Sequence, residues 1–376
     1  MDNNELKQHA LNVRRNIVQM VYDAQSGHPG GSLGCADILT YLYFNEMNIN
    51  KDNVKTTNRD RFVLSKGHCS PALYAILKEA NLLDENLKTF RQIDSKLQGH
   101  PNMNYVDGVD MSTGSLGQGI SCGVGMAIAN KLDKVDNRVY VLCGDGDIQE
   151  GIAKEAMSIA GVNALNKLIV IYDSNDIQLD GEVSRNYDED LALEAKSLKW
   201  NYIKVTDGND CDAIYKAIKK AQKSDKPTLI EVKTIIGYGT KNAGTNKVHG
   251  APIPHEETVE LRQEFGGEPF DMLEEVYAFY KKTFIKRGNK AYKEWDKIEK
   301  SESFINFING KHDVDYSKLT VFNDDVIATR KSGSIILKEI SLQDKLLIGG
   351  SADLMSSTQV GGIDGNYNES KLGRNI

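Results

Sequence analysis

The stretch that decides the fold runs from residue 138 to residue 175 and reads RVYVLCGDGDIQEGIAKEAMSIAGVNALNKLIVIYDSN. It begins with a continuous apolar run, RVYVLCGD, and ends with a second one, KLIVIYDSN. Between them, IQEGIAKEAMSIAG has the spacing of apolar residues that is typical of a helix. Continuous apolar strands joined by a helix indicate parallel strands that are covered on both faces. The stretch therefore predicts a doubly wound α/β fold with a parallel sheet.

Further elements of both kinds flank this stretch. A helix, a short strand and a helix rich in Ala and Gly are predicted before it, and two strands around a helix after it. They are expected at residues 5–25 (helix), 61–65 (strand), 114–131 (helix), 202–205 (strand), 211–223 (helix) and 228–232 (strand). Together they predict one sheet within a domain of residues 1–257.

The character of the sequence changes after this domain. Residues 258–320 are predicted to be a charged helical linker with little strand signal. Farther on, a helix from about Val326 leads to Lys345–Gly350, which reads as a strand that opens a second α/β unit over residues 321–376. We expect this unit to be incomplete, because too few residues follow to build a second sheet.

Composition limits the possible classes of function. Hydrophobic residues make up 40% of the chain and charged residues 26%, which is typical of a soluble globular protein. No apolar run is long enough to span a bilayer. The net charge of −7 argues against a surface for nucleic acid or anionic membranes. Five scattered cysteines without a CxxC pair suggest neither disulfides nor zinc, so a cytoplasmic protein is expected.

Oxygen-bearing side chains follow the two central strands. Asp145, in Gly144-Asp145-Gly146, comes just past the first strand, and Asn175 ends the second, 30 positions later. Since ligands of open α/β sheets bind at the carboxyl ends of strands, we expect both side chains at one edge. A carboxylate, an amide oxygen and a nearby carbonyl suit Mg²⁺ or Ca²⁺. Taken alone, each residue has a plainer interpretation, as a helix N-cap or a turn residue.

Four of the seven histidines lie in glycine-containing loops of the predicted sheet. They are His28 in GHPGG, His68 in KGHCS, His100 in GHPN and His249 in VHGAP. Histidines in such loops can reach a ligand as neutral donors or move protons. Each one alone reads as a surface or capping residue, but four in similar settings indicate an active site.

These motifs together resemble the transketolase family. A GDG motif with an asparagine about 30 residues on is its thiamine diphosphate motif. SGHPGG, DRFVLSKGHCS, TGSLGQG, YDSNDIQLDG, IIGYG…HGAP, TRKSGS and GGSADL then occur in the family's order, over practically the whole chain. The resemblance thus implies a thiamine-diphosphate-binding domain followed by the start of a pyrimidine-binding domain.

The resemblance also implies a role for each matching residue. It assigns three metal ligands, namely Asp145, Asn175 and the carbonyl of Ile177. It assigns the cofactor site to His68, Gly114, Leu116, Gly146, Glu150, Asn175, Leu179, His249 and Asp353. Glu150 matches a carboxylate that links the two cofactor sites of a dimer. Catalytic roles fall to His28, His100 and His249. Substrate binding falls to His28, His249, Arg330 and Ser357.

The implied reaction is reversible transfer of a two-carbon ketol unit from a ketose phosphate to an aldose phosphate. The implied cofactors are thiamine diphosphate and Mg²⁺ or Ca²⁺, and the implied assembly is a homodimer. The family's glutamate against the pyrimidine N1′, and its aromatic pocket for that ring, match nothing in this sequence. We therefore expect the chain alone to be inactive and to need a C-terminal pyrimidine-binding half, whether the sequence is truncated or one half of a split enzyme.

Two alternatives stay open at this point. A 1-deoxy-xylulose-phosphate synthase shares the GDG…N unit, although GHPGG and GGSADL fit transketolase better. A catalytically incomplete cofactor-binding or regulatory subunit would explain the missing glutamate, but it would not need His28 and His100.

One departure from the family pattern concerns the cofactor site itself. Asp147 stands where many relatives have a small or neutral residue, and it would oppose an anionic ligand unless its side chain points away.

Overall fold

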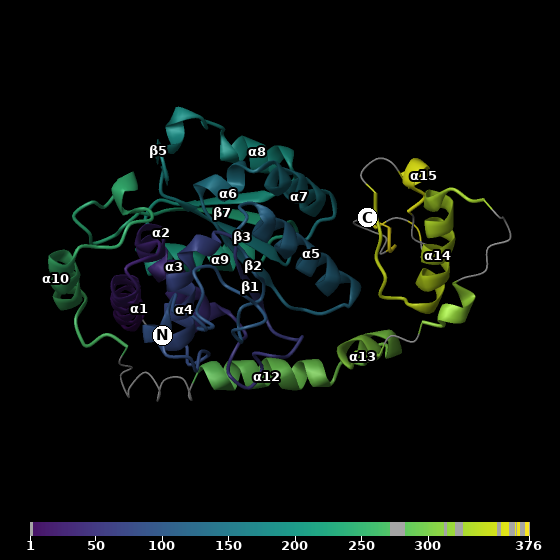
Figure 1. The fold of residues 1–376 in the computed structure, drawn as a ribbon, viewed down its shortest axis with the longest axis horizontal. Coiled ribbons are helices and arrows are strands. Elements are labelled where there is room, and N and C mark those ends of the chain that lie inside the picture. Colours follow the sequence, from purple (N-terminus) through teal and green to yellow (C-terminus); the bar gives the residue numbers. More distant parts are fainter. Residues whose placement is uncertain are drawn as a thin grey trace. The chain divides into compact units, whose positions relative to one another are not determined.

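The sheet and helices of the chain are seen in a computed structural model (Figure 1), which describes residues 3–270, 283–311, 314–319, 326–351, 355–360, 365, 367–368 and 373–375. The chain divides into two compact units, residues 1–295 and 296–376. The domain limits expected at residues 257 and 320 stay predictions.

The first unit is built on a five-stranded sheet in the order β1-β2-β3-β7-β6, with every neighbouring pair parallel. This confirms the predicted parallel α/β fold. The strands are β1 (Arg61–Leu64), β2 (Val139–Cys143), β3 (Leu168–Ser174), β6 (Asn201–Val205) and β7 (Thr228–Lys233). All residues of β2 and β3 are buried, as their apolar sequences predict.

Helices cover both faces of this sheet (Figure 1). The helices of the first unit are α1 (Asn3–Ala24), α2 (Pro29–Gly34), α3 (Ala36–Tyr41), α4 (Ser70–Glu79), α5 (Gln118–Leu132), α6 (Asp145–Gln149), α7 (Gly151–Val162), α8 (Leu191–Ser197), α9 (Cys211–Ala221), α10 (His255–Phe265) and α12 (Phe284–Asp296). Alternate residues of β2, Tyr140 and Leu142, share the main core with α1, α3, α4 and α9. The intervening Val141 faces α5 on the opposite side.

Small residues allow the helices on the α5 side to approach their neighbours closely. A Cβ atom on Gly123 of α5 would lie 2.4 Å from Cγ2 of Val141. A Cβ atom on Gly161 of α7 would lie 1.7 Å from the carbonyl oxygen of Leu198. These positions explain why the predicted helix at 114–131 is rich in Gly and Ala.

Two predicted elements differ from the structure in instructive ways. The single helix expected over IQEGIAKEAMSIAG is two helices, because Glu150 has an extended backbone (ψ 138°) between α6 and α7. The strand expected at Lys345–Gly350 amounts, within the described residues, to one isolated parallel bridge between Gly349 and Asn375. An apolar run forms a stable strand only when several of its residues pair with a neighbouring strand, and here only one residue pair is formed among the described residues.

The described residues of the second unit are mainly helical. They are α13 (Glu302–Ile308), α14 (Thr329–Gln343) and α15 (Met355–Thr358). α14 confirms the helix expected from about Val326. Within the described residues of the whole chain, no helix is both long and apolar enough to cross a membrane.

The close packing at Gly161 gives a stability prediction. Gly161→Ala should lower the free energy of unfolding by roughly 2–3 kcal/mol, because the added methyl group must displace the backbone at Leu198. Gly125→Ala, a matched change in α5 where an added Cβ meets nothing within 4 Å, should leave it unchanged or slightly higher. Urea unfolding of both variants measures the difference, and equal effects would contradict the packing described here.

Candidate active site at the carboxyl edge of the sheet

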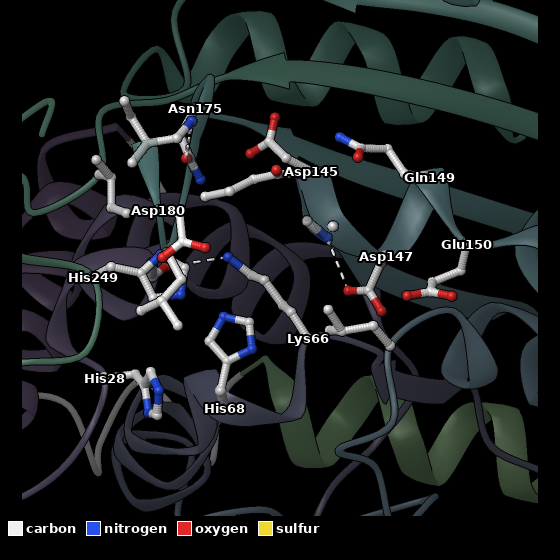
Figure 2. Close-up of a pocket in the computed structure, with 18 of the residues that line it drawn as sticks. His28, Lys66, His68, Asp145, Asp147, Gln149, Glu150, Asn175, Asp180 and His249 are labelled. Carbon is white, nitrogen blue, oxygen red and sulfur yellow. Dashed lines mark hydrogen bonds between the residues drawn. The ribbon is translucent and has the colours of Figure 1, made fainter. Parts of the chain in front are cut away.

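A cavity of about 800 Å³ lies where β1, β2, β3 and β7 end (Figure 2). Parallel strands bring their carboxyl ends, and the loops that follow, to one edge of a sheet. Residues from these loops and from α2 line it, namely His28, Gly31, Lys66, His68, His100, Gly114, Leu116, Gly144–Asp147, Gln149–Gly151, Asn175, Ile177–Glu182, Arg185, Asn186, Ile236 and His249. Twelve of the sequence-predicted site residues are therefore in one place.

Asp145 is the cavity residue whose hydrogen bonding is least complete. Its Oδ1 accepts a hydrogen bond of 2.6 Å from the hydroxyl of Tyr172. Its Oδ2 is buried and has no partner in the described part of the chain. Burial raises the pKa of this carboxyl to about 7, against the hydrogen bond from Tyr172, which lowers it. A buried, unpartnered carboxylate oxygen at the wall of a polar cavity is a ready ligand for a cation.

Asn175 lies beside Asp145, since its backbone N–H is among the groups that stabilise the Asp145 carboxylate. Its Oδ1 accepts a hydrogen bond of 3.2 Å from the N–H of Ile177. Ile177 opens a short hairpin of β4 (Ile177–Gln178) and β5 (Gly181–Glu182), whose turn carries Leu179, 64% exposed, into the cavity lining. The arrangement brings together all three predicted metal ligands and the predicted cofactor contact Leu179.

These oxygen donors fit a hard divalent cation. A carboxylate oxygen without a partner, an amide oxygen and a neighbouring backbone form the kind of ligand set that Mg²⁺ or Ca²⁺ uses. Among the described residues, no group of three or more His, Cys, Asp or Glu side chains could hold a metal. A cation here would therefore draw its remaining ligands from amides, backbone and the bound molecule.

Three of the four loop histidines form a cluster. The ring centroids of His28 and His68 are 5.2 Å apart, those of His68 and His249 5.4 Å, and those of His28 and His249 5.9 Å. Burial is the main cause that lowers the pKa of each to about 4, with neighbouring histidines or Lys66 as the next cause. All three rings are therefore neutral at pH 7, and each can donate one hydrogen bond and accept another.

Nδ1 of His28 and Nδ1 of His249 are buried and have no hydrogen-bond partner in the described part of the chain. His100 is more exposed and lies against Gly114, where an added Cβ would come 3.2 Å from its Cδ2. Burial, followed by His68, lowers the pKa of His100 as well. The four histidines thus line the same cavity in neutral form, as the sequence predicts for donors and proton carriers.

The loop that carries Gly114 and Leu116 is fixed by close contacts. Gly117 has a left-handed backbone (φ 78°), and a Cβ there would lie 2.6 Å from Cβ of Glu150. A Cβ on Gly146 would lie 3.0 Å from Leu116. Backbone and ligand can approach each other here because these glycines leave room. Glu150 itself is exposed at the cavity rim.

Asp147 does not oppose an anionic ligand in the way its charge suggests. Its side chain is buried and turned into the protein, where Oδ1 accepts bonds of 2.8 Å from the Ser65 hydroxyl and 2.8 Å from the N–H of Gly117. Oδ2 accepts a bond of 3.1 Å from the N–H of Gly144 (Figure 2). Asp147 therefore ties together the loops after β1 and β2 and the loop before α5.

A buried ion pair lies at the floor of the cavity. The ammonium of Lys66 binds the carboxylate of Asp173, and both side chains are almost fully buried. Nζ of Lys66 also donates a bond of 3.2 Å to the carbonyl of Gly31, and the hydroxyl of Thr234 donates to Asp173. Sequence reasoning missed this pair. The available signals were the position of Lys66 two residues before His68 and that of Asp173 two residues before Asn175.

Sequence reasoning also missed other lining residues, among them Gln149, Asp180 and Arg185. Three further predicted residues belong to the second unit. Arg330, in α14, and Ser357, in α15, are exposed residues of the second unit, and their predicted roles stay predictions. Asp353 lies outside the described residues.

Comparison with known proteins shows what the chain is similar to. The family model described as "Transketolase, thiamine diphosphate binding domain" matches residues 6–307. A curated relative, transketolase of Staphylococcus epidermidis, is 40% identical over 383 residues, which cover 95% of this chain and 58% of the relative. A probable transketolase of Streptococcus pneumoniae is 39% identical, over 96% of this chain and 59% of its own. The chain thus spans somewhat more than half the length of these relatives.

Solved structures show the same similarity. Transketolase from Leishmania mexicana superposes with a TM-score of 0.90 at 33% identity and covers 99% of this chain and 60% of its own. A transketolase of Pichia stipitis, solved in complex with sedoheptulose 7-phosphate, gives a TM-score of 0.88 at 34% identity, with the same coverage.

The neutral histidines predict how stability depends on pH. The pKa of His28, His68 and His249 is about 6.5 in the unfolded chain and about 4 in the folded one, so the unfolded state binds more protons between these values. The stability that the neutral rings contribute is fully present above pH 6.5 and is lost as the pH falls towards 4. His68→Asn should reduce the loss between pH 7.5 and pH 4.5 by roughly 1–3 kcal/mol relative to the unchanged protein. Parallel curves for both proteins, from urea unfolding, would contradict the assignment.

Proposed function

The chain belongs to the transketolase family, and from this premise we propose that its cavity binds thiamine diphosphate together with Mg²⁺ or Ca²⁺. The observation that carries the proposal is the buried Oδ2 of Asp145, which lies beside Asn175 and has no hydrogen-bond partner among the described residues. Asp145, Asn175 and the carbonyl of Ile177 would hold the cation. Gly146, Gly114, Leu116, Leu179, His68 and His249 would contact the cofactor.

A bound cation would balance negative charge in this cavity. The carboxylates of Asp145 and Asp180 line this cavity, its histidines are neutral, and Lys66 is already paired. Arg185, which is exposed and donates a hydrogen bond to the carbonyl of Asp180, is the remaining cation of the described lining. A divalent cation bound by Asp145 would neutralise both this carboxylate and the diphosphate oxygens. Glycines around Gly146 would let backbone approach the anion closely.

The reaction proposed for the complete protein is reversible transfer of a two-carbon ketol unit between sugar phosphates. Bound thiamine diphosphate supplies a carbon nucleophile and an electron sink. His28 and His249 would bond substrate hydroxyls through their unpartnered Nδ1 atoms, and neutral His100 would exchange protons at the rim. The relative crystallised with sedoheptulose 7-phosphate supports a sugar phosphate as substrate class. Arg330 and Ser357 are proposed to bind its phosphate.

We propose that turnover needs a pyrimidine-binding half in addition to these residues, since the relatives are considerably longer. A regulatory subunit that only binds cofactor is the second candidate. The two orphaned Nδ1 atoms of His28 and His249 speak against it, because binding a diphosphate does not use them. The relatives named above are transketolases, which leaves the synthase alternative without support.

An apolar stripe on α7 supports the proposed homodimer. Ile152, Ile159 and Val162 are 40%, 40% and 52% exposed, and they follow one another at helical spacing. The stripe begins beside Glu150, the residue that the family resemblance places between two cofactor sites. An exposed row of apolar side chains next to a ligand cavity is typical of a protein interface.

Binding of thiamine diphosphate tests the cofactor site. Calorimetric titration with Mg²⁺ at pH 7.5 should show metal-dependent binding, and Asp145→Asn should weaken it at least tenfold because a cation ligand is lost. Since Asp145 must lose its proton to bind a cation, affinity should also fall by about tenfold per pH unit below pH 7.

Asp84→Asn is the matched control, because it removes the same charge from an exposed carboxylate that is bound to Lys51 and does not line the cavity. Its affinity should stay within about threefold of the unchanged protein. Binding that is indifferent to both Mg²⁺ and Asp145→Asn would refute the proposed metal site.

Sedimentation velocity tests the interface. The unchanged protein should dimerise at micromolar concentration, and Ile159→Lys should shift it towards monomer because a charge would enter the apolar stripe. Leu193→Lys, a change at an exposed apolar residue of α8, should leave association unaffected. A wild-type protein that is monomeric throughout this range would rule the dimer out.

A further inference from the structure

The Lys66–Asp173 pair is a buried ion pair at the cavity floor to which the proposed chemistry assigns no role. It joins three segments that surround the cavity, since Lys66 follows β1, Asp173 belongs to β3, and Gly31 of α2 accepts a second bond from Lys66. Asp173 is fully enclosed, whereas Lys66 is both buried and part of the cavity lining. In the view of Figure 2, the Lys66 side chain extends between His68 and Asp145.

The fields of both partners reach the groups that face the cavity. Burial is the main cause that lowers the pKa of His68 and of His249. The ammonium of Lys66 is the next cause for His68, and for His249 it comes third, after His68. Burial is also the main cause that raises the pKa of Asp145, and the carboxylate of Asp173 raises it further. Cys35, Cys69 and Cys143 are described thiols whose pKa both partners affect, after burial, and all three are buried. The pair is thus electrically coupled to both sides of the proposed diphosphate site.

We propose that the Lys66–Asp173 pair sets the charge of the cavity floor, with Lys66 as a positioning residue whose main effect on the bound diphosphate is to cancel the negative charge of Asp173. The inference rests on the proposed binding of thiamine diphosphate and adds two residues to that site.

Removal of either partner leaves the charge of the other one without compensation. Without Lys66, the Asp173 carboxylate is an uncompensated anion in a poorly hydrated site, next to Asp145 and to an anionic ligand. Without the charge on Asp173, the Lys66 ammonium is an uncompensated cation in the cavity lining, and it gains a new partner in the diphosphate. A purely structural pair would behave differently, because breaking it from either side would disturb the fold and the ligand in the same direction.

The experiment measures the dissociation constant of thiamine diphosphate, in the presence of Mg²⁺, for the full chain and three variants. Lys66→Met should weaken binding at least tenfold, because the Asp173 carboxylate would then oppose the negative charge of Asp145 and of the diphosphate at a partly buried site. Asp173→Asn should bind as tightly as the unchanged protein or more tightly. The double variant Lys66→Met/Asp173→Asn has a neutral floor again, so its affinity should return to within about threefold of the unchanged protein.

Loss of fold is monitored separately by thermal unfolding. Asp110→Asn serves as the control, because Asp110 forms an equally buried pair with Arg59 and does not line the cavity. It should lower the unfolding temperature without a change of more than threefold in the dissociation constant. If Lys66→Met fails to fold, Asp173→Asn still decides the matter, since the proposal requires that it does not weaken binding.

Opposite effects of Lys66→Met and Asp173→Asn, with recovery in the double variant, would support the proposal. Equal weakening by both single variants would overturn it and leave the proposed cofactor site standing. An unchanged protein that binds no thiamine diphosphate with Mg²⁺ would overturn the proposed function, and the inference with it.

Discussion

The parallel register of β2 and β3 is the constraint on which the whole site depends. Cys143 pairs with Tyr172, so the residues that follow the two strands leave the sheet side by side. Asp145 therefore meets the hydroxyl of Tyr172 and the backbone of Asn175, although 30 positions of sequence separate the two predicted ligands. The helix α5 packs closely on these two strands, since a Cβ atom on Gly123 would lie 2.4 Å from Val141 of β2 and 3.7 Å from Leu168 of β3. The geometry of the candidate site is thus a consequence of strand pairing.

Electrostatics then decides what this edge can bind. The buried ammonium of the cavity is paired and its histidines are neutral, which leaves the exposed Arg185 as the available cation of the described lining. The carboxylate of Asp147 is turned inward and satisfied by Ser65, Gly117 and Gly144. We propose that such a site gains affinity for an anion through a divalent cation that arrives with its ligand. The neutral histidines would then serve the proposed proton transfers, because only the neutral ring can accept a proton.

The fold and most of the site could be predicted from the sequence, because both rest on local patterns. Continuous apolar strands gave β2 and β3, and loop histidines next to glycine gave His28, His68, His100 and His249. What escaped prediction depends on distant contacts. Lys66 meets Asp173 across the sheet, and Asp147 joins three loops, so neither role has a local signature. The break at Glu150 and the single bridge at Gly349 escaped for the same reason, since helical and apolar spacing alone do not fix where an element ends.

The central claim is that Asp145 and Asn175 hold a divalent cation against a diphosphate. Crystals of the chain grown with Mn²⁺ and thiamine diphosphate would test it most directly, because Mn²⁺ replaces Mg²⁺ at oxygen sites and scatters anomalously. The account predicts one strong anomalous peak within bonding distance of Oδ2 of Asp145, the side-chain oxygen of Asn175 and the diphosphate. A cofactor bound in the cavity with its cation elsewhere, or with no cation at Asp145, would contradict it.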